Sequence, residues 1–159
     1  MATHNEAMTD PRAREAATMI PVYGQLPFVP ERASGCDIFT RDGRQILDLY
    51  GGHAVAALGY GHPTLVEAIH TQSSQLLFQS NAVALDIRAD AAEQLTRVAP
   101  DGIERVFFVN SGAEANENAL RMALRTTGRR KVLAITMVFH GRTAAAGAVT
   151  WNAEKWYGF

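Results

Sequence analysis

The pattern Asn110-Ser-Gly-Ala-Glu-Ala-Asn-Glu117 could bind an anion, because it stands where a predicted strand becomes a predicted helix. The first N–H groups of a helix have no acceptors within the helix, and the helix dipole adds partial positive charge beside them. A phosphate group is therefore favoured at Ser111, Gly112 and Ala113. The same residues also fit a capping box, in which Ser111 and Glu114 satisfy these N–H groups without a ligand. The spacing leaves both interpretations open.

A second group of functional side chains, Phe139, His140 and Arg142, follows a predicted strand at 131–137. The carboxyl ends of parallel strands meet at one edge, so we expect these residues to share a rim with residues 111–113. Arg142 offers a planar fork for a carboxylate, and Phe139 offers a flat face for an aromatic ring. Taken singly, they also fit a surface arginine beside a core phenylalanine. No second His or Cys stands near His140 at metal-ligand spacing, so no metal site is predicted.

The elements that must position these residues form a βαβ unit. An apolar run at 105–110 predicts a buried strand, residues 111–127 predict a helix that stops at Gly128, and residues 131–137 predict a second buried strand. A strand, helix and strand within about thirty residues are typical of a parallel sheet with a right-handed crossover. The sequence therefore predicts an α/β fold with a mostly parallel sheet.

The preceding residues predict an arm, a hairpin and two helices. Prolines punctuate residues 1–35, which favours an N-terminal arm laid over another surface. Two short strands on either side of Asp42-Gly43 predict a hairpin, because Asp-Gly tolerates the positive φ of a tight turn. Apolar residues at helical spacing predict one helix that begins at Pro63 and another from Asp86 to Val98.

Composition excludes several classes of protein. The chain has 159 residues, with 15 Lys and Arg against 16 Asp and Glu, so no strongly basic surface for nucleic acid is expected. The first residues lack the apolar run of a signal peptide, and the uncharged span 49–66 is broken by glycines and Pro63, so no membrane segment is expected. The single cysteine, Cys36, fits a reducing compartment, and we expect a cytoplasmic protein.

Four motifs together resemble the class III pyridoxal-phosphate aminotransferases. They are Ser111-Gly-Ala-Glu-Ala-Asn-Glu117, Phe139-His-Gly-Arg-Thr143, Ala57-Leu-Gly-Tyr-Gly-His-Pro63, and Asp42-Gly-Arg44 with Leu47-Asp48. The resemblance covers about residues 20–159, and within the class the sequence is most similar to the acetylornithine, ornithine and succinylornithine aminotransferases. It implies part of a fold type I transferase, with residues 36–159 as the incomplete first part of the cofactor-binding large domain.

The resemblance also implies roles for individual residues. The cofactor would be pyridoxal 5'-phosphate, with its phosphate on the backbone of Gly112 and Ala113 and its ring stacked on Phe139. Arg142 would bind the substrate α-carboxylate. The other positions are implied by motif: Ser111 and His140 at the cofactor, Tyr23 and His53 at the substrate side chain, and Ser80 and Asn81 at the cofactor of a partner subunit in a homodimer.

One departure from the family pattern concerns the lysine that links to the cofactor. The chain contains only Lys131 and Lys155, and neither stands where the family has this lysine. We therefore expect the chain to be the N-terminal part of a longer enzyme and to be inactive alone. The intact protein would transfer the terminal amino group of N-acetylornithine to 2-oxoglutarate, as in arginine biosynthesis. The alternatives are an ornithine, succinylornithine or 4-aminobutyrate transaminase, or a noncatalytic module that binds the cofactor.

Overall fold

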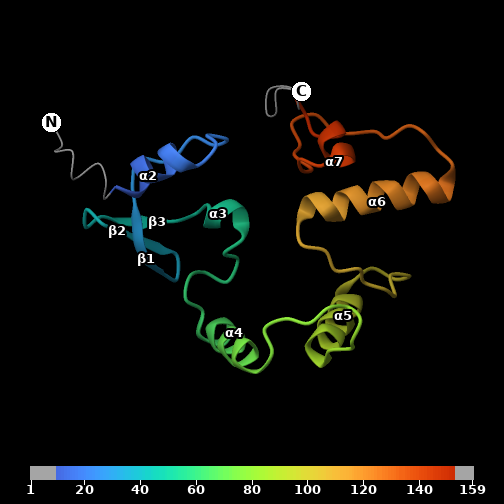
Figure 1. Ribbon diagram of the computed structural model, residues 1–159, viewed down its shortest axis with the longest axis horizontal. Helices are drawn as coiled ribbons and strands as arrows, with labels where there is room; N and C mark the ends of the chain where they lie inside the picture. Colours follow the sequence, from blue (N-terminus) through green and yellow to red (C-terminus); the bar gives the residue numbers. More distant parts are fainter. Residues whose placement is uncertain (1–9, 153–159) are drawn as a thin grey trace. The chain divides into compact units, whose positions relative to one another are not determined.

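The computed structural model describes residues 10–152, which divide into two units between Val83 and Ala84. The first unit contains, in order, α2 (Pro11–Thr18), β1 (Pro30–Ser34), β2 (Asp37–Thr40), β3 (Gln45–Leu47), α3 (Gly51–Ala54) and α4 (Pro63–Gln75). The second contains α5 (Asp86–Val98), α6 (Gly112–Thr127) and α7 (Ala144–Ala148) (Figure 1). Each unit is described by itself below.

Strands β2 and β3 form the predicted antiparallel hairpin, with Ile38 opposite Ile46. The turn between them contains Gly43, whose φ of 82° is the left-handed conformation that glycine adopts without strain. The Asp42 carboxylate holds this turn, because it accepts hydrogen bonds from the hydroxyl of the buried Thr40 and from the guanidinium of Arg44. The Asp-Gly prediction is confirmed.

The described part of the predicted arm contains a helix and a strand. Helix α2 begins with Pro11 and is capped by Asp10, whose carboxylate accepts the N–H of Arg12 at 3.0 Å. Strand β1 pairs antiparallel with β2, and the Arg32 guanidinium lies 3.6 Å from the centre of the Phe39 ring. Prolines thus mark the start of each element instead of excluding regular structure.

Two glycines allow the chain after β3 to return to the sheet. Gly35 and Tyr60 exchange backbone hydrogen bonds of 3.0 and 2.8 Å. Gly59 lies so close to this bridge that a Cβ on it would stand 2.8 Å from the Gly35 carbonyl oxygen, and its φ is 76°. The motif at 57–63 therefore has a structural role in the first unit.

Replacing Gly59 by alanine should lower the free energy of unfolding by about 1–3 kcal/mol, because the added methyl group meets backbone atoms that cannot rotate away. Gly24→Ala is the matched control, since nothing lies within 4 Å of its Cβ position. Urea unfolding of the two variants tests the prediction. Equal stability of both would contradict the close approach at Gly59.

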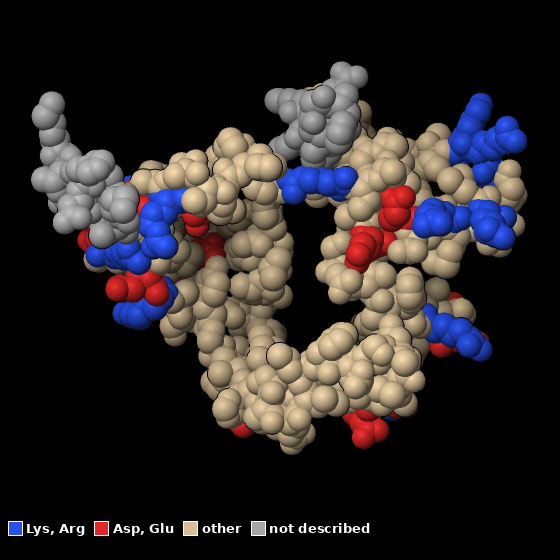
Figure 2. Space-filling view, viewed as in Figure 1, with Lys and Arg blue, Asp and Glu red and all other residues tan. Residues whose placement is uncertain are grey.

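Helices α4, α5 and α6 confirm the helices predicted from apolar spacing, and α6 has both predicted ends. Ser111 is its N-cap, and Gly128 is a left-handed C-cap with φ 66°. Basic side chains gather in its last turn and just beyond its C-terminal end, where the helix dipole favours them (Figure 2). They are Arg125, Arg129, Arg130 and Lys131. Among residues 10–152 no helix is long and apolar enough to cross a membrane.

The prediction of buried strands at 105–110 and 131–137 is wrong for this structure. Neither segment is a strand, and Phe107 and Leu133 are 67% and 98% exposed. A strand exists through hydrogen bonds to a neighbour, and no described residue pairs with either segment. The sheet that the structure contains is the antiparallel sheet β1-β2-β3 of the first unit.

Candidate functional site

The N-terminus of α6 carries a helix cap and leaves two amides available. Ser111 Oγ accepts the N–H of Glu114 at 3.1 Å, and Glu114 Oε2 accepts the N–H of Asn110 at 2.7 Å. The Ser111 cap is therefore confirmed, whereas the Glu114 carboxylate bonds the N–H of Asn110 and not the N–H of Ser111 that a capping box would use. Neither bond uses the N–H groups of Gly112 and Ala113, for which no described residue supplies an acceptor. The cap and an anion site can therefore coexist.

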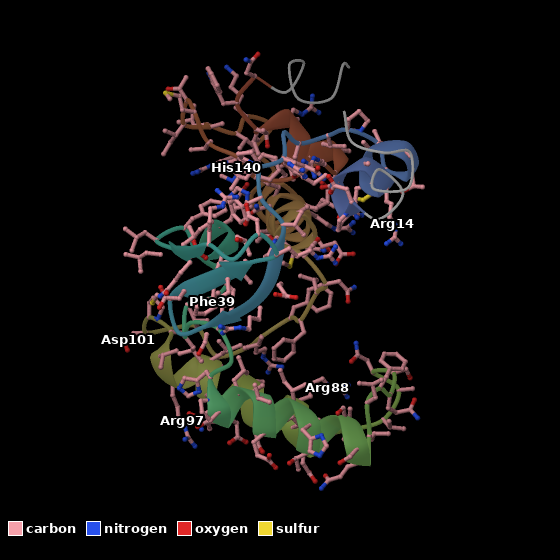
Figure 3. The ribbon with its side chains drawn as sticks, turned by 90° about the vertical axis from the view of Figure 1, so that its left-hand side faces the viewer. Arg14, Phe39, Arg88, Arg97, Asp101 and His140 are labelled. Atoms are coloured by element: carbon pink, nitrogen blue, oxygen red, sulfur yellow. The ribbon has the colours of Figure 1, made fainter. Side chains whose placement is uncertain are left out.

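The loop that carries Phe139 and Arg142 touches the first turn of α6. Gly141 is buried with φ 132°, and a Cβ on it would lie 2.5 Å from the Cβ of Ala113. One helical turn further along, the Asn116 side-chain amide donates 2.7 Å to the carbonyl of His140, which lies beside α6 and α7 in Figure 3. The structure thus brings together the two groups of residues that the sequence placed on one rim.

A single carboxylate oxygen of α6 holds the following segment. Glu117 Oε2 accepts the hydroxyl of Thr143 at 2.6 Å and the N–H groups of Ala145 and Ala146 at 2.8 and 3.1 Å. The Thr143 hydroxyl, followed by the amides of Ala146 and Ala145 and by the charge of Arg121, holds the pKa of this carboxyl below its ordinary value. The Glu117 charge is therefore directed to the start of α7 and not to the amides at the start of α6.

The loop also closes on itself. The buried Thr150 hydroxyl accepts the N–H of His140 at 3.0 Å and donates to the carbonyl of Ala146 at 2.9 Å. The N–H of Trp151 donates to the Val138 carbonyl at 2.9 Å, where the loop begins. His140 thus contributes to the site through its backbone, which fixes the position of its neighbours.

Phe139 and Arg142 project from this loop with their functional groups near each other. The Phe139 ring is 56% exposed, and the Arg142 guanidinium carbon lies 5.7 Å from the centre of the ring. A guanidinium near an aromatic face is favourable, and the two groups are of the kinds that bind anionic and flat ligands. The arrangement combines amide donors, an aromatic face and a cationic fork.

The other predicted site residues lie in the first unit. Tyr23 is 60% exposed and follows α2, while Ser80 and Asn81 precede the end of the unit. Ser80 Oγ accepts the N–H of Ala82 at 3.2 Å, which fixes a local turn. No group of three or more His, Cys, Asp or Glu residues suited to a metal exists among residues 10–152.

His53 stands in an unusual backbone conformation. Its φ is 61°, and that of Ala54 is 62°, so α3 is a left-handed turn that costs L-residues about 1–2 kcal/mol each. Asp48 stabilises this turn, because its carboxylate accepts the N–H groups of Tyr50 and Gly51 at 2.8 and 2.9 Å, and also the Tyr60 hydroxyl. The ring of His53 contacts that of Tyr50 at 4.7 Å.

The Asp48 contacts predict an acid-sensitive first unit. The Tyr60 hydroxyl, followed by the Gly51 and Tyr50 amides, lowers the pKa of Asp48 from 3.8, so this carboxylate stabilises the fold above pH 3.8. That contribution should be lost as the pH falls through the folded-state pKa. Urea unfolding at a series of pH values should show that wild type has a higher free energy of unfolding than Asp48→Asn. This difference should narrow below pH 3.8. A difference that does not change with pH would contradict this role.

The sequence of this chain matches a known family. The model of the aminotransferase class-III family matches residues 19–158, almost the whole chain. The chain belongs to the class III aminotransferases. The predicted family is thereby confirmed, and pyridoxal phosphate is the cofactor of this class.

Known relatives agree with this assignment. The class III chain is 39% identical to the acetylornithine aminotransferase of Archaeoglobus fulgidus, over 89% of its own length and 37% of that protein. It is 36% identical to an aminoadipate semialdehyde transaminase of Deinococcus radiodurans, over 84% of its length and 31% of that protein. The chain thus spans about a third of the curated relatives it matches.

A solved structure confirms the fold class. The taurine:2-oxoglutarate aminotransferase of Bifidobacterium kashiwanohense, in complex with PLP and glutamate, is 28% identical and matches with a TM-score of 0.80 over 94% of this chain and 34% of that chain. The chain therefore has the fold of part of a fold type I transferase.

Sequence reasoning missed the residues that hold the loop. Asn116, Glu117 and Thr150 reach partners that are 9 to 29 positions away, and such distances have no signature in local spacing. One signal was available: positions 113, 116, 117 and 120 share one face of α6, and two of them are polar. Polar residues on a helix face that should be apolar indicate a bonded partner.

Proposed function

We propose that the full-length protein is a pyridoxal-phosphate-dependent transaminase that takes the terminal amino group of N-acetylornithine and passes it to 2-oxoglutarate. The observation that carries the proposal is the contact between Gly141 and Ala113, which places the Phe139 and Arg142 loop beside two amides without acceptors. The two amides suit the phosphate of the cofactor, and the fork of Arg142 suits the substrate carboxylate. The Archaeoglobus acetylornithine aminotransferase supports the choice of donor.

The residues present fit the cofactor. The N–H groups of Gly112 and Ala113 suit a phosphate at the positive end of the 16-residue helix α6. Apart from the adjoining backbone, no described atom lies within 4 Å of a Cβ position on Gly112, so a ligand can approach the backbone there. Ser111 borders the same amides, the exposed face of Phe139 suits stacking on the ring, and His140 holds that side of the loop through its backbone.

Substrate recognition follows from charge and shape. Arg142 binds the α-carboxylate shared by the amino donor and the oxo acid, because its fork matches two carboxylate oxygens. Tyr23 and His53 select the donor side chain. Ser80 and Asn81 approach the cofactor of the partner subunit in a homodimer. We further propose a cytoplasmic location, for which the single cysteine is the supporting observation.

The linking lysine lies outside this sequence in our proposal. Pyridoxal phosphate supplies an aldehyde that links to amino groups and a ring that withdraws electrons. Lys131 follows the far end of α6, about 24 Å along the helix from Gly112 by the usual rise per residue. Lys155 lies outside the described residues. The 159-residue chain alone is therefore expected to bind cofactor without transaminating.

Absorbance between roughly 330 and 430 nm tests the proposed function, because the cofactor absorbs there in forms that differ with its chemical state. The full-length protein should carry a cofactor band that changes when N-acetylornithine is added and reverts with 2-oxoglutarate. Ornithine, succinylornithine, 4-aminobutyrate and the amine that corresponds to aminoadipate semialdehyde serve as competing amino donors. A protein without the band, or with a band that no donor changes, would reject the proposal.

Borohydride reduction separates the enzyme from a noncatalytic cofactor-binding module. Reduction should fix the cofactor covalently to a lysine of the full-length protein, and peptide mapping should place that lysine outside this sequence. The 159-residue chain should lose its cofactor on dialysis after the same treatment. Cofactor that stays fixed to Lys131 would overturn the assignment of the linking lysine.

A further inference from the structure

One face of α6 joins the phosphate end of the helix to the loop that carries the ring and carboxylate contacts. Ala113 touches Gly141, Asn116 bonds the His140 carbonyl, and Glu117 bonds Thr143. The spacing of these helix residues, at i, i+3 and i+4, puts them in one row. Successive turns of one rigid helix therefore hold the amides and the loop.

The Glu117 carboxylate is well suited to this task. It is half-buried and places one oxygen against a hydroxyl and two amides, of Thr143, Ala145 and Ala146, that begin α7. Bonds to an ionised acceptor are about twice as strong as neutral ones. The carboxylate also complements the positive end of the short helix, so the loop is held at a defined place along α6.

Asn116 acts on the other side of the same loop. Its amide nitrogen bonds the carbonyl of His140, which directly follows Phe139 and stands two residues before Arg142. Asn116 and Glu117 therefore hold this segment through hydrogen bonds to residues before and after Arg142. The hydrogen bonds of these two side chains do not involve the N–H groups of Gly112 and Ala113.

We propose that Asn116 and Glu117 are positioning residues that set the distance between the phosphate amides of α6 and the loop with Phe139 and Arg142. Recognition of the cofactor ring then depends on them, whereas recognition of phosphate alone does not. This inference rests on the proposed function, since it assumes that phosphate and ring bind at these two places.

Two ligands distinguish positioning from general stability in the full-length protein. Inorganic phosphate uses only the amides, while pyridoxine 5'-phosphate adds the ring but has no aldehyde to link with a lysine. In Glu117→Ala the dissociation constant for pyridoxine 5'-phosphate should rise about threefold to tenfold, the value of one aromatic contact. The constant for inorganic phosphate should stay within about twofold, well below the effect of one lost contact.

A control variant and a second measurement distinguish the positioning role from a general loss of the fold. Glu104→Ala removes an exposed carboxylate of the same unit and should change neither constant. Glu117→Gln keeps an acceptor oxygen and should recover most of the ring affinity. Hydrogen exchange of the Ala145 and Ala146 amides should speed up about tenfold or more in Glu117→Ala, because these amides lose a charged acceptor.

Each outcome decides one question. If wild type binds neither ligand, the proposed function of the α6 amides fails, and the positioning role falls with it. If wild type binds both ligands but Glu117→Ala weakens both equally or neither, the positioning role alone is wrong. Unchanged exchange at Ala145 and Ala146 would also overturn it. A selective loss of ring affinity, recovered in Glu117→Gln, supports it.

Discussion

Replacing Gly141 by alanine should lower the free energy of unfolding by at least about 2 kcal/mol and abolish cofactor binding by the full-length protein. The added Cβ would stand 2.5 Å from the Ala113 Cβ and 2.7 Å from its Cα, so the loop must move away from α6. The φ of 132° adds strain for any residue with a side chain. Urea unfolding and absorbance titration with pyridoxal phosphate measure the two effects.

Gly147→Ala is the matched control, in the short helix that follows this loop. Gly147 lies in α7 without a positive φ, and outside its own helix the nearest atom to an added Cβ would be the Gly141 carbonyl oxygen at 4.0 Å. Alanine at a helical position of this kind should be neutral or stabilise by about 0.5–1 kcal/mol. If Gly141→Ala behaves like Gly147→Ala, the close contact with Ala113 does not exist and the site is not assembled as described.

Replacing Arg142 by alanine should weaken the binding of both substrates of the proposed reaction by about 2–5 kcal/mol, because each carboxylate loses its charged partner. KM for N-acetylornithine and for 2-oxoglutarate should rise together. The dissociation constant for pyridoxine 5'-phosphate should change far less, since this ligand has no carboxylate for Arg142 to bind and the 5.7 Å contact of Arg142 with Phe139 is a weak one. Steady-state kinetics and ligand titration on the same preparation test this split.

Two further variants sharpen the Arg142 test. Arg142→Lys keeps the charge but not the planar fork, so it should recover only part of the substrate affinity. Arg129→Ala removes an exposed cation of the cluster beyond α6 and should leave both KM values unchanged. A large effect of Arg129→Ala, or full recovery with lysine, would show that net charge and not the fork of Arg142 binds the carboxylate.

Local chemistry allowed part of the fold to be predicted from the sequence. Ser111 and Gly128 fix the ends of α6 because capping and left-handed termination depend on residues within one turn. Asp42 and Gly43 fix the hairpin for the same reason. Helix α5 follows the predicted bounds of Asp86 and Val98, which apolar spacing sets without help from distant residues.

Features that depend on distant partners could not be predicted. The apolar runs 105–110 and 131–137 have the composition of buried strands, but a ladder requires neighbours that these residues do not have. The left-handed turn at His53 is held by Asp48 and not by its own residue types. The rim that Phe139, His140 and Arg142 share with residues 111–113 was predicted, whereas the Gly141 contact and the Glu117 bonds that hold it were not.

The backbone amide shifts of Gly112 and Ala113 test the central claim most directly. Adding pyridoxal phosphate to the full-length protein, labelled with nitrogen-15, should move these two resonances, and inorganic phosphate should move the same pair. The amides of α5 should stay in place, because that helix carries none of the site residues. A cofactor that binds while the Gly112 and Ala113 resonances do not move would contradict the account.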